Sequence, residues 1–246
     1  MRALQTPIAP HRSERGRKNF ASDEMVWLFD LDNTLHDCSR FIFTQIDQHM
    51  TRAVMQTLDV DIDTANRLRK QYWKRYGATV IGMVRNHGVN ARRFLALSHD
   101  FDPAPLVHAE SALANKLDKL KGRKILLTNA PLDYARQVLK TLGILRHFES
   151  IWTMDHMTLQ GQIRPKPTLA LMRQVLARVG APARQVVLVE DTLRNLKVAR
   201  QVGMRTVHVF HPGTPFSGMH GGRPNYVDMR INSLSQLLTG QRTLRR

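Results

Sequence analysis

Two aspartates and a threonine, each two positions apart, close an apolar segment near the start of the chain. The segment reads VWLFDLDNT and ends with Asp30, Asp32 and Thr34. If the backbone stays extended here, residues two apart face the same side, so these polar groups address one space. An ionised carboxylate that is buried without a partner is costly. The spacing therefore predicts that a cationic or reactive group meets the two acids.

Other apolar runs also end in polar residues. The run KILLTNA carries Thr128 and Asn129, QVVLVED ends in Glu190 and Asp191, and Lys166 precedes a helical pattern. In open α/β sheets the ligand lies outside the carboxyl ends of the strands, so we expect these side chains to lie together. Any one of them alone has an ordinary explanation as a cap or loop residue. Their joint arrival at strand ends favours a functional site.

The residue types of this set indicate phosphate chemistry. Asp30, Asp32 and Asp191 would repel one another within a few ångströms unless a metal or a proton intervened. Mg²⁺ is the natural neutraliser, because it prefers oxygen ligands and keeps several waters and a substrate phosphate oxygen. The hydroxyl of Thr128 and the ammonium of Lys166 both suit a phosphoryl oxygen.

Short β-rich runs alternate with helical patterns through most of the chain. The predicted strands are residues 26–32, 124–130, 150–155, 185–191 and 205–210. The helical patterns between and after the later strands cover residues 132–142, 167–179 and 192–202, each followed by a glycine suited to a helix C-cap. Nearly continuous apolar runs are typical of a parallel sheet covered on both faces. We therefore expect an α/β fold with a doubly wound, mainly parallel, Rossmann-like sheet.

A long insertion separates the first two predicted strands. It has no good strand pattern but has helical patterns at residues 41–58, 63–76, 78–86, 91–97 and 106–120. A crossover needs only a dozen or so residues, so most of the insertion is expected to form a helical cap over the carboxyl edge of the sheet. The predicted division is a basic mobile arm (1–22), an α/β core (23–35 and 106–238), a cap (36–105) and a basic tail (239–246).

The chain carries a net charge of +17, which attracts anions such as phosphate esters, nucleic acid or acidic membrane surfaces without identifying which. A nucleic-acid contact is compatible with the basic termini, although a solvated arm is the commoner explanation; the candidate contact residues of the N-terminal arm are Arg12, Arg15, Arg17 and Lys18. The single cysteine, Cys38, forms no internal disulfide, and we find no membrane-spanning stretch or signal peptide. We therefore expect a cytoplasmic protein without membrane association.

The motifs and their order resemble those of the haloacid dehalogenase superfamily of phosphohydrolases. The resemblance rests on DLDNT (30–34), LLTNA (126–130), RPKPT (164–168) and VEDTLRN (189–195). It implies that Asp30 is the nucleophile that forms an aspartyl-phosphate, and that Asp32 protonates the leaving alcohol and then activates water. It also implies that Thr128, Asn129 and Lys166 bind the phosphoryl group, and that the charge of Lys166 assists catalysis. The implied Mg²⁺ ligands are Asp191, Asp30 and the backbone carbonyl of Asp32, with Glu190 as a support or alternative ligand.

Two positions depart from the common pattern of that superfamily. Asn33 stands where many members have glycine, and Glu190 stands where many have aspartate. The superfamily varies at both positions, so phosphatase chemistry is still implied. A dehalogenase is disfavoured, because halide release needs no leaving-group acid and the chain carries Asp32.

Planar side chains in the insertion bear on the substrate. The stretch QYWKRYG places Tyr72, Trp73 and Tyr76 on one helical segment, and such rings can stack on a nucleobase or pack within the cap. Together with DLDNTLHDCSRFI, the cap pattern looks like the pyrimidine 5′-nucleotidase branch, which implies nucleoside monophosphates as substrates. The alternatives are a phosphoglycolate or sugar-phosphate phosphatase, a phosphomutase and, in another class, a basic nucleic-acid-associated protein that retains the fold.

Overall fold

A six-stranded parallel sheet forms the centre of the molecule. The computed structural model describes residues 24–211, 223–241 and 243–245, so the predicted mobile arm lies outside the described residues. The strands occur in the order β3-β2-β1-β6-β7-β8, and every neighbouring pair is parallel. Their bounds are β1 Val26–Phe29, β2 Arg123–Leu127, β3 Ser150–Trp152, β6 Val186–Glu190, β7 Arg205–Val209 and β8 Met229–Ile231. The predicted doubly wound α/β fold is confirmed.

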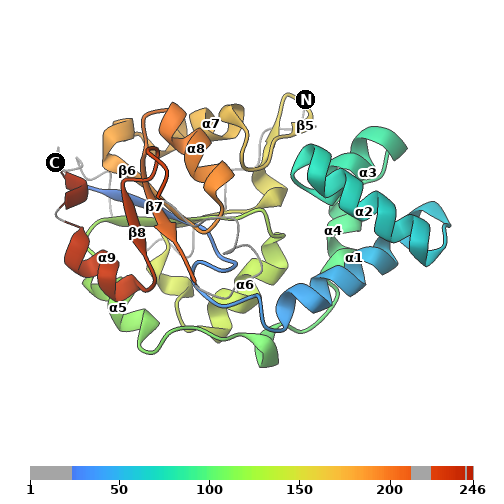
Figure 1. Ribbon diagram of the computed structural model, residues 1–246, viewed down its shortest axis with the longest axis horizontal. Coiled ribbons are helices and arrows are strands. Elements are labelled where there is room, and N and C mark those ends of the chain that lie inside the picture. The colour runs from blue at the N-terminus through green and yellow to red at the C-terminus, as the bar shows by residue number, and fades with distance from the viewer. Residues whose placement is uncertain (1–23, 212–222, 242, 246) are drawn as a thin grey trace, which may run out of the picture.

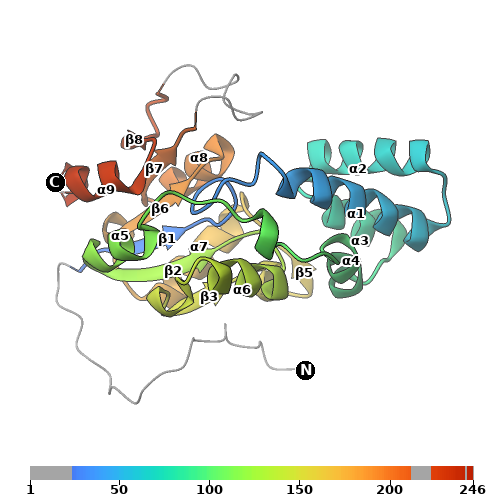
Figure 2. The same ribbon diagram turned by 90° about the horizontal axis from the view of Figure 1, so that it is seen from below.

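Helices cover both faces of this sheet (Figure 1). One face carries α7 (Leu169–Val179) and α8 (Leu193–Gln201). The opposite face carries α5 (Leu113–Lys119), α6 (Leu132–Thr141) and α9 (Leu234–Gly240), as the view from below shows (Figure 2). Because both faces are covered, the strands read as continuous apolar runs.

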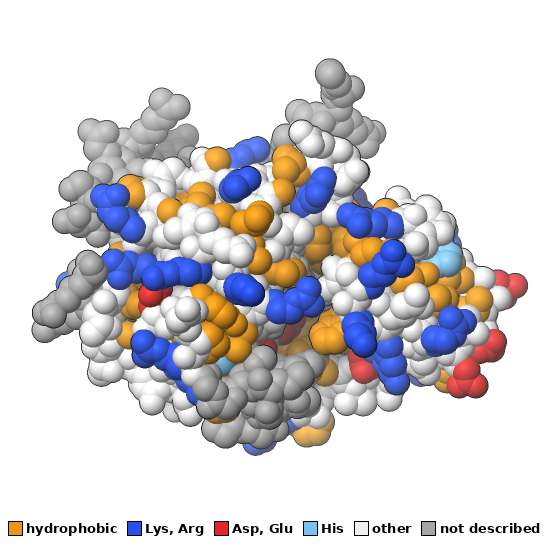
Figure 3. Space-filling model, turned by 45° about the horizontal axis from the view of Figure 1, so that its top comes forward, with side chains coloured by type: hydrophobic (Ala, Val, Ile, Leu, Met, Phe, Trp, Pro, Cys, Tyr) orange, Lys and Arg blue, Asp and Glu red, His pale blue; other side chains and the backbone are white. Residues whose placement is uncertain are grey.

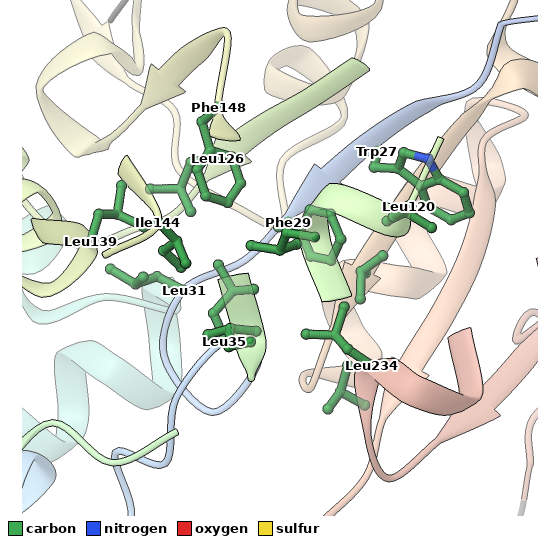
Figure 4. Close-up of a cluster of buried hydrophobic side chains, with 14 of the residues drawn as sticks. Trp27, Phe29, Leu31, Leu35, Leu120, Leu126, Leu139, Ile144, Phe148 and Leu234 are labelled. Atoms are coloured by element: carbon green, nitrogen blue, oxygen red, sulfur yellow. The ribbon is translucent and has the colours of Figure 1, made fainter. Parts of the chain in front are cut away.

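The alternation of side chains along β1 divides the core into two halves. Trp27 and Phe29 pack with residues of α5, α6 and α9, and Figure 4 shows them among Leu120, Leu126 and Phe148. Val26 and Leu28 pack with α7, α8 and cap residues on the other face. All four side chains are buried, which fixes the register of β1 and hence the position of the residues that follow Phe29.

The insertion between β1 and β2 forms a helical cap beside the sheet, at the right of Figure 1. Its helices are α1 (Ile42–Leu58), α2 (Ile62–Tyr76), α3 (Thr79–His87) and α4 (Ala91–Ser98), and α1 packs against both α2 and α4. Left-handed residues end the first three of these helices, with glycine at Gly77 and Gly88. The exact limits predicted for the cap, 36–105, stay a prediction.

Two segments differ from the sequence-based expectation. The helix expected over 106–120 begins only at Leu113, because Ala112 adopts a left-handed conformation and the preceding residues run as irregular backbone. The expectation of a solvated tail from residue 239 was wrong for Leu244, which is 2% exposed and belongs to the core together with Leu237 of α9.

Short strands were also missed by the sequence patterns. The strand β8 and the hairpin of β4 (Thr158–Leu159) and β5 (Gln162–Ile163) carry two or three residues each and contain no continuous apolar run.

Candidate active site

The parallel pairing of β1 with β2 and β6 brings their carboxyl ends to one edge of the sheet. Phe29 lies level with Leu126 on one side and Val189 on the other. The residue after Phe29 is Asp30, whose backbone N–H donates to the carbonyl of Val189 at 3.0 Å. Asp30, Thr128 and Glu190 therefore emerge side by side, and all are buried.

Lys166 joins two of these strand ends. Its Nζ lies 2.7 Å from an Asp30 carboxylate oxygen and 2.7 Å from a Glu190 oxygen. The side chain of Lys166 is only 1% exposed, so both ion pairs are shielded from water. The predicted catalytic lysine thus lies against the predicted nucleophile.

Asn129 fixes the backbone of the segment that carries this lysine. Its Nδ2 donates to the Lys166 carbonyl at 3.1 Å, and its Oδ1 accepts from the Lys166 N–H at 3.0 Å. The carboxamide is therefore occupied by Lys166, and the structure favours a positioning role over the predicted side-chain contact with phosphate. Thr128 Oγ1 accepts from the Ala130 N–H, which leaves its hydroxyl hydrogen to donate to a ligand.

The carboxylates of this cluster carry more negative charge than Lys166 can balance. Burial and the charge of Glu190 raise the pKa of Asp30 well above its usual value, although Lys166 opposes the shift. Burial also raises the pKa of Glu190, and together with Asp30 it raises the pKa of Asp191 to about 6. Burial alone would lower the pKa of Lys166, but the charges of Asp30 and Glu190 raise it above its ordinary value.

This charge and donor set fit a divalent cation. Asp30, Glu190 and Asp191 each present a carboxylate oxygen within 4.8 Å of the others. Mg²⁺ takes oxygen ligands, and its charge would relieve the repulsion that raises these pKa values. Asp30 and Asp191 are the ligands that the geometry favours. Both Glu190 oxygens already have partners, Lys166 and the Thr192 N–H, whereas only one Asp30 oxygen contacts Lys166.

The turn after β1 explains why asparagine is accepted where glycine is common. Asn33 has a φ of 56°, in the left-handed region that asparagine tolerates better than most residues with a side chain. Its Oδ1 accepts from the Cys38 N–H at 3.0 Å and from the Ser39 hydroxyl at 3.1 Å. The Asn33 side chain is therefore compatible with the turn and also stabilises it through hydrogen bonds to Cys38 and Ser39.

Asp32 makes its side-chain hydrogen bonds with residues outside the Lys166 cluster, and the sequence reasoning missed these partners. Its Oδ1 lies 3.0 Å from His36 Nε2, 3.0 Å from Cys38 Sγ and 2.9 Å from the Tyr134 hydroxyl. His36 and Cys38 stand within a few residues of the DLDNT motif, so spacing offered a signal for them. Tyr134 is 102 positions away from Asp32, and no local pattern could have indicated it.

These contacts favour the ionised form of Asp32. Burial would raise the pKa of Asp32, but the hydrogen bond and charge of His36, together with Cys38 and Tyr134, lower it from its usual value. Burial and the Asp32 charge raise the pKa values of the Cys38 thiol and the Tyr134 hydroxyl well above their usual values. Both groups therefore stay protonated at neutral pH and can donate to the carboxylate.

The aromatic residues proposed for the cap have different surroundings. Tyr72 is 6% exposed, its ring packs against Gly82, and its hydroxyl lies 2.6 Å from His87 Nε2. The structure therefore favours a packing role for Tyr72 over the predicted substrate contact. Trp73 is 53% exposed. Tyr76 is half-buried and has the Arg75 and Arg85 guanidinium groups 5.2 and 5.4 Å from its ring centroid.

The residue after Tyr76 lies near the segment that follows Lys166. A Cβ atom added to this residue, Gly77, would lie 3.8 Å from Pro167 Cδ, so the end of α2 lies beside that segment of the core. Of the aromatic residues proposed from sequence, Tyr76 is thus the one whose chain neighbour lies beside the Lys166 segment.

Sequence comparison gives relatives with phosphate-related names. Phosphate metabolism protein 8 of Saccharomyces cerevisiae is 27% identical over 199 residues, which cover 76% of this chain and 61% of that protein. The chain therefore spans about three-fifths of the length of that relative. Glyceraldehyde 3-phosphate phosphatase of Methanocaldococcus jannaschii is 25% identical over 235 residues, covering 86% of this chain and 94% of that protein.

Solved structures and a family model agree with the fold described above. A phosphatase from Thermococcus onnurineus has a TM-score of 0.59 at 20% identity, covering 88% of this chain and 96% of its own. CbbY from Rhodobacter sphaeroides has a TM-score of 0.61 at 16% identity, covering 87% and 96%. At these identities the likeness shows the fold alone. The model of the haloacid dehalogenase-like hydrolases matches residues 27–209, and the chain therefore belongs to this family of hydrolytic enzymes.

Proposed function

We propose that the protein is a Mg²⁺-dependent phosphomonoester hydrolase that acts through an aspartyl-phosphate at Asp30. The observation that carries this proposal is the buried cluster in which Lys166 contacts both Asp30 and Glu190, with Asp191 close by. Such a cluster can hold a dianionic phosphoryl group only if its own carboxylates are offset by cations. The phosphatase named among the relatives supports the same reaction class.

The proposed reaction has two displacements at phosphorus. An Asp30 carboxylate oxygen attacks, the bond from phosphorus to the ester oxygen breaks, and the leaving oxygen takes a proton from Asp32. Water then attacks the aspartyl-phosphate, Asp32 accepts a water proton, and inorganic phosphate leaves with Asp30 restored. Mg²⁺ held by Asp30 and Asp191 would offset charge on the transferring group, and Lys166 would add its own positive charge.

Asp32 is ionised in the resting state, so its acid role needs a proton taken up with the substrate. The approach of a phosphate dianion favours this uptake, because a nearby like charge raises the pKa of a carboxyl group. The lowered resting pKa of Asp32 suits its second role, in which the carboxylate accepts the water proton.

We further propose nucleoside 5′-monophosphates, of the pyrimidine type, as substrates in the cytoplasm. The support is Tyr76, a ring flanked by guanidinium groups at the end of α2, where the next residue, Gly77, lies beside Pro167 of the Lys166 segment. Among the described residues no helix is long and apolar enough to cross a membrane.

A purely nucleic-acid-binding role has weaker support. Figure 3 shows Lys and Arg side chains scattered over one face of both the core and the cap, with apolar and uncharged atoms between them. This distribution attracts anions in general and does not outline one groove for a strand.

The first experiment measures phosphate release, with and without Mg²⁺, from nucleoside monophosphates, sugar phosphates, phosphoglycolate, glyceraldehyde 3-phosphate and 4-nitrophenyl phosphate. The variant Asp30→Asn should lose turnover and should no longer retain label from a ³²P-substrate after acid quenching. The matched control is Asp37→Asn, which changes a nearby acid on the same loop outside the cluster. Turnover of Asp30→Asn within about tenfold of the wild type would contradict the nucleophile assignment.

The substrate proposal has a separate test in the cap. Stacking contributes about 1–3 kcal/mol per base, so Tyr76→Ala should lower kcat/KM for uridine monophosphate by several-fold to about a hundredfold. The loss for 4-nitrophenyl phosphate should be much smaller, because that ester does not reach the base position. The exposed Trp73 is tested in the same way, and Tyr72→Ala serves as the control for a general loss of cap packing. Equal losses on both substrates would contradict the nucleotide assignment.

A further inference from the structure

Asp32 is held on one side only. The described donors, His36, Cys38 and Tyr134, all reach Oδ1, and no described residue makes a hydrogen bond to Oδ2. The Asp32 side chain is 21% exposed, whereas the His36 side chain is fully buried. Since donors surround Oδ1, the accessible part of the carboxylate is the side that carries Oδ2.

The donors come from two separate parts of the fold. His36 and Cys38 lie on the loop after β1, close to Asp32 itself. Tyr134 lies on α6, which follows the long insertion in the sequence. Its ring centroid lies 5.3 Å from that of His99 and 6.1 Å from that of Phe101. The orientation of Asp32 is therefore fixed jointly by its own loop, by α6 and by the segment that leads out of α4.

We propose that Tyr134 and His36 are positioning residues that bind Oδ1 of Asp32 and so present Oδ2 as the oxygen that exchanges protons with the substrate. The inference rests on the proposed phosphatase function and assigns to it residues outside the motifs of the family. A general acid must point at the leaving oxygen, and a carboxylate that is free to rotate spends part of its time misdirected. Donors on Oδ1 remove that rotation and leave the other oxygen open.

The experiment compares two esters of similar size that differ in their need for an acid. Benzyl phosphate releases a poor alkoxide leaving group, whereas 4-nitrophenyl phosphate releases a phenolate that departs readily. The constant kcat/KM covers the steps through cleavage of the ester bond, so it includes protonation of the leaving oxygen. The loss in Tyr134→Phe comes from misdirection of the Asp32 carboxyl group, and small misplacements of a catalytic group are costly, so kcat/KM for benzyl phosphate should fall by about tenfold or more. The loss for the nitrophenyl ester should be below about threefold if protonation is the affected step.

Matched variants separate positioning from general damage. Tyr226→Phe removes the same hydroxyl from a partly buried ring that packs on the other face of the sheet, and it should change neither ester. His36→Gln keeps an N–H donor and should preserve the ratio of the two kcat/KM values better than His36→Leu, which has none. In an Asp32→Asn background, Tyr134→Phe should have no further effect on that ratio, because the residue through which it acts has already been changed.

The outcomes distinguish the inference from the function on which it rests. Loss of both esters to the same degree in Tyr134→Phe, or an undiminished effect in the Asp32→Asn background, would overturn the positioning role while leaving the phosphatase intact. An unfolding curve for each variant shows whether equal losses arise from a damaged fold, and that result too counts against the inference. If the wild type hydrolyses neither ester with Mg²⁺, the proposed function itself fails.

Discussion

Replacing Lys166 with methionine tests the charge balance of the buried cluster. The substitution keeps a similar volume but leaves Asp30 and Glu190 facing each other without the cation that now lies 2.7 Å from both. Breaking a buried ion pair by removing one partner costs about 3–5 kcal/mol, because the other charge stays buried without compensation. We expect Lys166→Met to lower the free energy of unfolding by that amount at pH 7.5.

The measurement is urea unfolding in EDTA, so that no divalent cation replaces the lysine charge. Glu190→Gln removes one carboxylate, and the double variant should be more stable than the sum of the two single losses predicts, by about 1–3 kcal/mol. The cost of Lys166→Met should also shrink as the pH falls. The charge of Lys166 lowers the raised pKa values of Asp30 and Glu190, so its removal raises them further. The folded variant then takes up protons at higher pH than the folded wild type and regains part of its lost stability as the pH falls.

Two results would refute this reasoning. A loss below about 1 kcal/mol for Lys166→Met would mean that the lysine is not the main compensating charge of the cluster. Strict additivity in the double variant would mean that Lys166 and Glu190 do not interact in solution as they do here. Leu139→Ala, a cavity variant remote from these charges, is the control and should show no comparable pH dependence.

Three further predictions concern other parts of the molecule. Asp32→Asn should lower kcat/KM more for nucleoside monophosphates than for 4-nitrophenyl phosphate; equal losses would argue against the acid role. Leu237→Ala should lower the free energy of unfolding by about 2–5 kcal/mol, because this side chain of α9 is fully buried. Leu238→Ala, at a partly buried position, should lower it less, and a negligible loss for Leu237→Ala would favour a detached tail. Burial lowers the pKa of His99 to about 4, below its usual 6.5, so the folded state binds fewer protons than the unfolded state and loses stability as the pH falls through that interval. Between pH 7 and pH 5 the free energy of unfolding of the wild type should therefore fall by about 2 kcal/mol more than that of His99→Asn, as measured by urea unfolding. If the two proteins lose stability in parallel over this pH range, His99 is not a buried neutral histidine.

The strand pattern and the charged strand ends were predictable from sequence because they depend on local order. Apolar runs such as VVLVE report burial on both faces, and in a parallel sheet all carboxyl ends lie at one edge. That Asp30, Thr128 and Glu190 lie close together follows from the burial of their strands and from the parallel order of the sheet. The edge strand β8 was not predicted in the same way, because the charged Arg230 interrupts its apolar residues.

The hydrogen bonds and contacts of individual side chains could not be predicted, because they depend on distances in space between residues that are far apart in the sequence. Asn129 was expected to bind phosphate by its type and position, yet its carboxamide is used by the backbone of Lys166. Tyr72 and Tyr76 lie one turn apart on α2, but Tyr72 is buried against Gly82 whereas Tyr76 is half-buried beside two guanidinium groups. Residues on one helix can thus have different surroundings even when the same neighbouring helix contacts both of them.

The charge of the cluster constrains how the site can accept its substrate. With Asp30, Glu190 and Asp191 ionised, Lys166 leaves a formal charge of −2, and a phosphate dianion would add to it. The net charge of +17 draws anions toward the protein surface, but at physiological ionic strength its effect is screened over about 8 Å. Attraction at that range cannot offset repulsion between groups a few ångströms apart in a buried site. Substrate affinity must therefore depend on compensation inside the cluster, so inorganic phosphate should bind much more weakly in EDTA than in Mg²⁺.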